Sequence, residues 1–152
     1  MSADRSIQQN EIIIRRLVEE IVNKGDFAAI DEVYDARFIN HDAPPGAPVG
    51  LEGIRQQYMT FRSAFPDCQE TIDAITAKGD KIIVRLTVQG THTGRWMGIA
   101  PTGKPVRAMR INILRTDGGK IVEQWGNSGD GDLMRQLGAI PRVAPASKQR
   151  VG

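Results

Sequence analysis

Two aspartates near the end of the chain, Asp130 and Asp132, follow a segment that carries Trp125. Residues Lys120–Asn127 have the pattern of a strand, and Leu133–Gly138 that of a short helix closed by glycine. Either aspartate could be the N-cap of that helix. Because a helix has one N-cap residue, the other aspartate would have a different role. A carboxylate between a tryptophan and apolar walls would lose water, which suits a general base or acid. Asp130 is therefore the first catalytic candidate.

The two histidines, His41 and His92, are the side chains most easily set to exchange protons near neutral pH. In the expected strand Lys81–His92 apolar residues alternate, and His92 continues the apolar series. This spacing predicts His92 on the core or cavity face. His41 directly follows Asn40, so in a regular strand only one of these neighbours reaches a pocket. The alternative for His92 is a purely structural hydrogen bond at the end of the strand, and for His41 a loop histidine that holds the proline-rich segment.

A second strand, expected at Val106–Arg115, can present either of its faces to a cavity. Ile111 lies on one face, whereas Arg110 and Asn112 lie on the other. If the second face is inward, Arg110 could pair with Asp130 or bind an anionic group of a substrate. Alternation alone leaves both options open.

The chain lacks the patterns of metal and nucleotide sites. The two histidines are far apart, and Cys68 is the only cysteine, so no metal-ligand spacing is present. The glycine-rich motifs that bind nucleotide phosphates are absent, and so are nucleophile motifs around serine or cysteine. We expect no cofactor and no metal.

The elements around these residues predict an α+β fold. Helices are expected at 8–24, 27–34 and 51–65, the second of them capped by Asp26. An extended segment is expected at 38–41, and strands at 70–76, 81–92, 106–115 and 120–127. A proline-rich loop at 42–50 could lie over a pocket mouth. Helices on one face of a curved sheet leave a gap, which favours an apolar pocket.

The composition fits one globular domain. Of 152 residues, 40% are hydrophobic and 25% charged, and we expect a single domain over 1–141 followed by a flexible basic tail at 142–152. Much of the net charge of +2 comes from this tail, so the domain has no basic face and nucleic-acid binding is disfavoured. Without a signal-peptide pattern or a membrane-length apolar run, a cytoplasmic protein with no membrane partner is expected.

Five segments, in this order and spacing, resemble the SnoaL-like polyketide cyclases (ester cyclases) of the nuclear-transport-factor-2-like superfamily. They are Phe38-Ile-Asn-His-Asp42, Ala64-Phe-Pro-Asp67, Gly90-Thr-His-Thr-Gly94, Pro101-Thr-Gly-Lys-Pro-Val106 and Gly119–Gly138. The resemblance implies a cone-shaped fold, in which N-terminal helices pack in a curved antiparallel or mixed β-sheet that encloses a cavity. It also implies that the protein forms a homodimer through the outer sheet face. No cofactor is expected from the resemblance.

The same resemblance implies a reaction, the closure of a ring by intramolecular aldol condensation, in which a pocket carboxylate removes the proton α to a carbonyl. The family pattern looks like Trp-x-x-x-Asp-x-x-Gly-Leu-Leu-x-Gln-Leu-Gly. Counted from Trp125, it reaches Gly138 without a gap. Gly129 then stands at the position of the family acid, and Asp130 comes one residue later.

We therefore expect a cofactor-free, polyketide-cyclase-like enzyme that binds an apolar, oxygenated small molecule and performs aldol cyclisation, isomerisation or hydrolysis. The expected catalytic residues are Asp130, His92 and His41. The expected substrate-binding residues are Asn40, Tyr58, Trp96, Met97, Arg110, Asn112, Trp125 and Asn127. The alternatives are a non-catalytic small-molecule-binding domain and an interaction module of the same fold.

Overall fold

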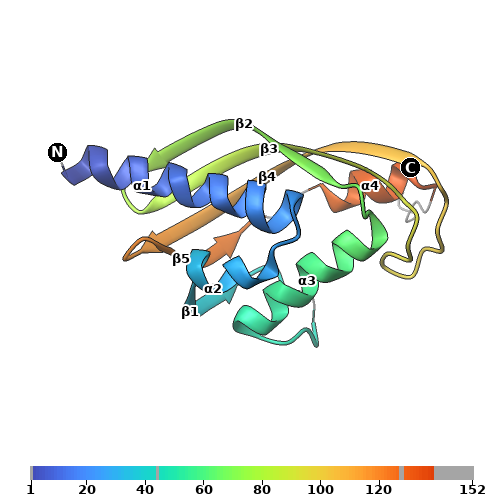
Figure 1. Cartoon of the computed structure of the whole chain (residues 1–152), viewed down its shortest axis with the longest axis horizontal. Helices are drawn as coiled ribbons and strands as arrows, with labels where there is room; N and C mark the ends of the chain where they lie inside the picture. The colour runs from blue at the N-terminus through green and yellow to red at the C-terminus, as the bar shows by residue number, and fades with distance from the viewer. Residues whose placement is uncertain (1, 44, 127–128, 139–152) are drawn as a thin grey trace, which may run out of the picture.

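The computed structural model describes residues 2–43, 45–126 and 129–138, with side chains from residue 8 onward. The helical elements are α1 (Ser2–Arg16), the π-helical η1 (Leu17–Asn23), the 3-10 turn η2 (Phe27–Ala29), α2 (Ile30–Val33), α3 (Gly50–Ala64) and α4 (Asp130–Gln136). The strands are β1 (Tyr34–Asn40), β2 (Gln69–Lys78), β3 (Lys81–Thr91), β4 (Pro105–Asp117) and β5 (Lys120–Trp125). Figure 1 shows α1, α2 and α3 on one side of the long, curved strands.

The five strands form one sheet in the order β1-β5-β4-β3-β2. Strand β1 runs parallel to β5, and the other neighbouring pairs are antiparallel. The fold is thus α+β with a mixed sheet, as the sequence predicted.

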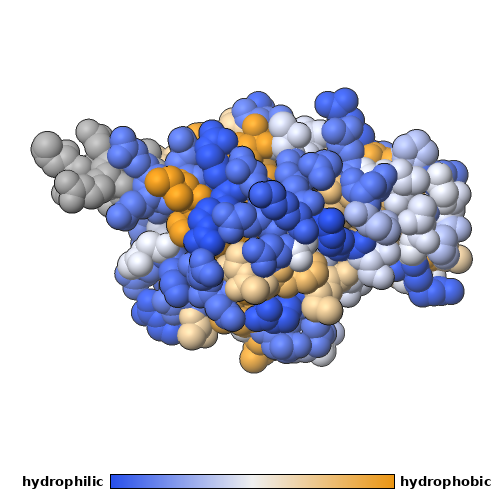
Figure 2. All heavy atoms as spheres, viewed as in Figure 1, coloured by the Kyte–Doolittle hydropathy of each residue, from blue (hydrophilic) through white to orange (hydrophobic). Residues whose placement is uncertain are grey.

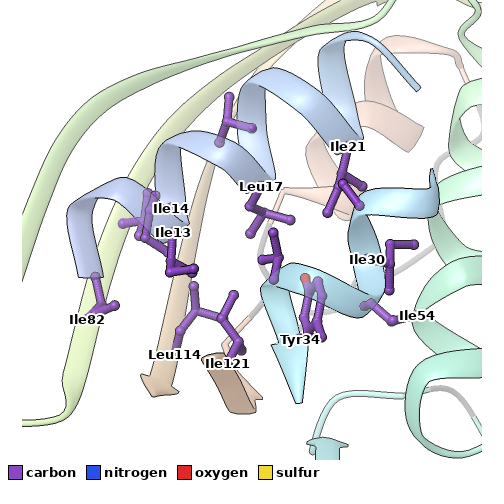
Figure 3. Close-up of a cluster of buried hydrophobic side chains, with 14 of the residues drawn as sticks. Ile13, Ile14, Leu17, Ile21, Ile30, Tyr34, Ile54, Ile82, Leu114 and Ile121 are labelled. Atoms are coloured by element: carbon purple, nitrogen blue, oxygen red, sulfur yellow. The ribbon is translucent and has the colours of Figure 1, made fainter. Parts of the chain in front are cut away.

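One core cluster joins the N-terminal helices to the inner face of the sheet. Along β3 the alternating residues from Ile82 to Val88 are buried, which confirms the predicted face of this strand. Figure 3 shows Ile14, Leu17 and Ile21 gathered with residues of the sheet. Truncation of such a fully buried side chain to alanine typically costs about 2–5 kcal/mol of stability.

A second cluster lies around the C-terminal helix. Leu133 and Leu137 from this end of the chain are buried against Phe65, Trp96 and Ala108. Tyr58 on α3 packs against both clusters. The two clusters therefore fix the position of α3, and of α4, relative to the sheet.

Three local expectations need correction. The first helix begins earlier than predicted and continues as π-helical turns through Asn23. The second helix ends at Val33, and Tyr34 already belongs to β1, where it is fully buried. The side chain of Asp26 makes no capping hydrogen bond. Its backbone carbonyl accepts the N–H of Ala29 instead, because a 3-10 turn follows.

On the face that Figure 2 shows, hydrophilic residues cover most of the surface, and apolar residues form small groups between them. Among the described helices, none combines the length and apolar character needed to cross a membrane. The expected tail at 142–152 lies outside the described residues.

Candidate active site

A cavity of about 690 Å³ opens on the inner face of the sheet, within the size range of small-molecule sites. All five strands contribute to its lining, together with η1, α3 and α4. Apolar side chains such as Phe61 and Leu86 alternate with a limited set of polar groups. The loop before α3 also lines it. The first turn of α3 packs tightly on this loop, since a Cβ at Gly53 would lie 2.1 Å from the carbonyl oxygen of Pro48.

The first polar region is a charged wall formed by Glu70, Arg110 and Asp130. One guanidinium nitrogen of Arg110 lies 3.0 Å from the Asp130 carboxylate, and Nε lies 3.8 Å from Glu70. The side chain of Arg110 is only 8% exposed, that of Glu70 11%, and that of Asp130 39%. The guanidinium also lies over the ring of Phe61, 5.1 Å from its centroid. Arg110 is therefore held from three sides, and β4 presents its Arg110 face to the cavity.

Glu70 is a cavity residue that the sequence reasoning missed. Burial raises the pKa of its carboxyl group above the ordinary value, although the nearby Arg110 guanidinium opposes this shift. The alternation of the strand could have indicated it. Glu70 is two residues from Ile72, which packs on the core, so both side chains point to the same face of the strand. A glutamate at the inward parity of a strand is unusual enough to indicate a site.

Gly129 explains how Asp130 reaches Arg110. Its φ is +113°, and a Cβ there would lie 2.8 Å from Cγ of Arg110 and 2.9 Å from the carbonyl oxygen of Met109. A side chain at position 129 is thus excluded by both backbone conformation and space. Gly129 is also the N-cap of α4, without a side-chain capping bond, so the expectation that Asp130 or Asp132 caps this helix is wrong. The cap position is one residue earlier.

The second polar region is an amide wall formed by Asn40, Gln57, Asn112 and Gln124, all of which line the cavity. The Asn40 amide donates to Oε1 of Gln57 at 3.3 Å, and Asn40 pairs with Gln124 in the register of β1 and β5. The side-chain oxygen of Asn112 is buried and has no hydrogen-bond partner within the described part of the chain. A ligand N–H or O–H could fill that position.

Tyr58 lines the cavity, and its hydroxyl lies 2.6 Å from that of Tyr34. Burial raises the pKa of both phenols, so they are neutral hydrogen-bonding groups near pH 7. Trp96 and Met97 also line the cavity. Trp96 is buried, whereas Met97 is 57% exposed and has an unusual positive φ of 48°.

Trp125 and His41 lie outside the cavity, contrary to expectation. The register of β4 and β5 shifts between Arg115 and Thr116, where β5 contains an extra residue. This bulge reverses the alternation, so Gln124 faces inward and Trp125 faces outward. His41 stacks on Trp125 with ring centroids 4.9 Å apart and contacts Glu123 at 3.1 Å. Asn40 is therefore the neighbour that reaches the pocket.

His92 is fully buried beside Phe65 of the second core cluster and does not line the cavity. Its Nδ1 accepts the backbone N–H of Thr102 at 3.2 Å, and its ring packs 5.3 Å from that of Phe65. Its backbone also bonds to Gly103 and Lys104. His92 thus anchors the segment that carries Trp96. This is the structural hydrogen-bonding role that was the alternative to catalysis for this histidine. The remaining candidate, Asn127, lies outside the described residues.

Residues 12–137 match the family model described as SnoaL-like polyketide cyclase. Because this match spans most of the chain, the protein belongs to the SnoaL-like polyketide cyclase family. The curated proteins include no match to the sequence.

Solved structures resemble this chain over most of its length. TsrD from Streptomyces laurentii is 27% identical, with a TM-score of 0.78 over 90% of this chain and 97% of its own. IdmH, a candidate polyketide cyclase from Streptomyces antibioticus, is 32% identical, with a TM-score of 0.71 over 84% and 97%. A candidate polyketide cyclase from Bacillus cereus is 29% identical, with a TM-score of 0.72 over 84% and 79%.

Proposed function

We propose that this protein is a cofactor-free cyclase that acts on an apolar, oxygenated small molecule in the cavity. The observation that carries the proposal is the Asp130 carboxylate at the cavity lining, fixed by the ion pair with Arg110. Its partial exposure leaves room for a ligand to approach. The family membership and the cyclase candidates among similar structures support the same class of reaction.

The reaction requires a base and an oriented substrate. In an intramolecular aldol closure, the base removes a proton α to one carbonyl, and the resulting carbanion attacks a second carbonyl of the same molecule. Asp130 is the proposed base, because its charge-assisted contact with Arg110 holds it at the cavity lining. The amide wall can hydrogen-bond the carbonyl and hydroxyl oxygens of the substrate, while Phe61 and Leu86 contact its apolar parts.

A second candidate function is binding without catalysis. It is favoured by Gly129 at the position of the family acid and by the existing ion pair between Asp130 and Arg110. In such a protein the same cavity holds a ligand, but no carboxylate reaches a reactive carbon.

Deuterium exchange from D2O into the α-carbon of β-tetralone, followed by NMR, separates the two functions. We expect the protein to accelerate this exchange and Asp130→Asn to reduce the acceleration roughly 10²-fold, the usual size of general acid–base catalysis. Asp132→Asn is the matched control, because Asp132 is in the same turn but contacts Arg135 and Gln136. Binding of the ketone in a thermal-shift assay without any exchange would favour the binding protein.

We also propose a homodimer through the outer face of the sheet. Ile83, Met109 and Ile111 on this face are 47%, 55% and 40% exposed, and β3 and β4 place them in adjacent rows. An interface of standard size would bury about 800 Å² per partner. In sedimentation, we expect the wild type to be dimeric and Met109→Asp to be monomeric. A monomeric wild type at high micromolar concentration would contradict the dimer.

A further inference from the structure

Glu70 and Asp130 share one guanidinium but have different surroundings. Asp130 comes from α4, lies 3.0 Å from Arg110 and is partly exposed. Glu70 comes from β2, lies 3.8 Å from the same side chain and is almost fully enclosed. Two carboxyl groups in unlike environments are the usual arrangement of a separate acid and base.

The backbone of Glu70 is fixed from outside the sheet. Asn23 of η1 accepts its N–H at 2.7 Å and donates to its carbonyl oxygen at 3.0 Å. This double hydrogen bond holds the start of β2 against the helix, so the Glu70 side chain has a defined origin in the cavity lining.

We propose that Glu70 is the proton donor of the cavity, a neutral carboxylic acid that protonates the substrate oxygen while Asp130 acts as the base. This assignment rests on the proposed cyclase function. It goes beyond that proposal because it divides the proton transfers between two residues on opposite flanks of Arg110.

The charges around Glu70 favour its neutral form. Within the described ranges, the one cation that opposes the neutral form is Arg110, which lies closer to Asp130 than to Glu70. The other titratable groups that face it are the phenols of Tyr58 and Tyr34 and the thiol of Cys68. Burial raises the pKa of each of these three groups, which keeps them uncharged near pH 7. A neutral Glu70 leaves Arg110 and Asp130 as a balanced ion pair.

The proton transfers balance without a further reactant. Asp130 takes the α-proton, and the electron pair of that C–H bond forms the new C–C bond to the second carbonyl carbon. The π electrons of that carbonyl move to its oxygen, which receives the proton of Glu70. Asp130 is then protonated and Glu70 ionised, and transfer of one proton through water restores both.

The ionisation of Glu70 can be measured without a substrate. Carbon-detected NMR of glutamate-labelled protein gives one carboxyl titration per glutamate, and Glu70→Gln identifies the signal of Glu70. We expect its midpoint to lie above the ordinary value of about 4.3. Glu19→Gln, a change of an exposed glutamate on η1, should leave that signal in place. A midpoint at or below the ordinary value would overturn the proposal.

Two reactions then separate the roles. Glu70→Gln should slow the ring closure of a linear aryl diketone roughly 10²-fold. It should slow the α-exchange of β-tetralone far less, because this exchange protonates no second carbonyl. Asp130→Asn should lose both activities. Equal losses of both in Glu70→Gln would show that Glu70 only supports Asp130, and would overturn the assignment. A wild type that catalyses neither reaction contradicts the cyclase function itself, and the NMR titration then decides separately whether Glu70 is held neutral.

Discussion

The charged wall and the amide wall of the cavity use their polar atoms in different ways. In the charged wall, Arg110 lies between two carboxyl groups and on the ring of Phe61, so its partners are already in place. In the amide wall, the buried oxygen of Asn112 has no partner among the described residues. The first wall is organised before a ligand arrives, which suits proton transfer, whereas the second has hydrogen-bonding capacity that a ligand can use.

The largest effect is expected from removal of the cation of the charged wall. Arg110→Met should lower the free energy of unfolding by about 3 kcal/mol, because it removes a buried charged group and leaves the Asp130 carboxylate without its partner. Arg107→Met, on the exposed face of the same strand, is the control and should change it little. Urea denaturation measures both. Equal stability of the two variants would mean that the charged wall contributes nothing to the fold.

The next effect concerns the glycine that places Asp130. Gly129→Ala should destabilise the protein by more than about 1 kcal/mol, because alanine is strained at positive φ and its Cβ would overlap Arg110. Gly131→Ala is the matched control in the first turn of α4, since its Cβ would meet its nearest neighbour at 3.9 Å. That change should be neutral or stabilising in thermal unfolding. A harmless Gly129→Ala would show that α4 can move away from Arg110.

The pH dependence of stability tests the buried acid. Because the pKa of Glu70 is raised in the folded state, the folded protein binds the proton more tightly than the unfolded chain. Stability should therefore fall as the pH rises from the ordinary glutamate value through the folded value. Glu70→Gln should remove this part of the slope, measured as the difference between the two unfolding curves. Parallel pH profiles of wild type and variant would contradict the raised pKa.

The smallest effect is expected in the amide wall. Asn112→Leu removes a buried oxygen that lacks a partner, so unfolding stability should stay equal or rise. Affinity for the alcohol 2-tetralol, whose hydroxyl can donate a hydrogen bond to that oxygen, should fall by about 0.5–1.5 kcal/mol. Calorimetry measures the affinity. A gain in affinity together with stability would mean that this wall is not used for recognition.

The sequence predicted the fold well where one period dominates. The alternation in β3 gave the inward residues correctly, and the spacing of Ile13, Leu17 and Ile21 gave the first helix. It failed at β5, because a bulge reverses the faces and single-sequence alternation carries no sign of it.

The candidate site was predictable only in part. Asn40, Tyr58, Arg110, Asn112 and Asp130 do line one cavity. The pairing of Glu70 with Arg110 joins strands that are not neighbours in the sheet, and no local pattern encodes that contact. His92 shows a different limit of the alternation argument. A side chain on the inward face of a strand can be buried in the core as readily as it can line a pocket.

A structure of the protein with bound β-tetralone tests the central claim that the charged wall is catalytic and the amide wall recognises the ligand. We predict that the α-carbon of the ketone faces the Asp130 carboxylate within reach of proton transfer, with a side-chain N–H of the amide wall close to its oxygen. A ketone whose α-carbon points away from Asp130, with the Arg110–Asp130 ion pair unchanged and its oxygen away from the amide wall, would contradict the account and identify a binding protein.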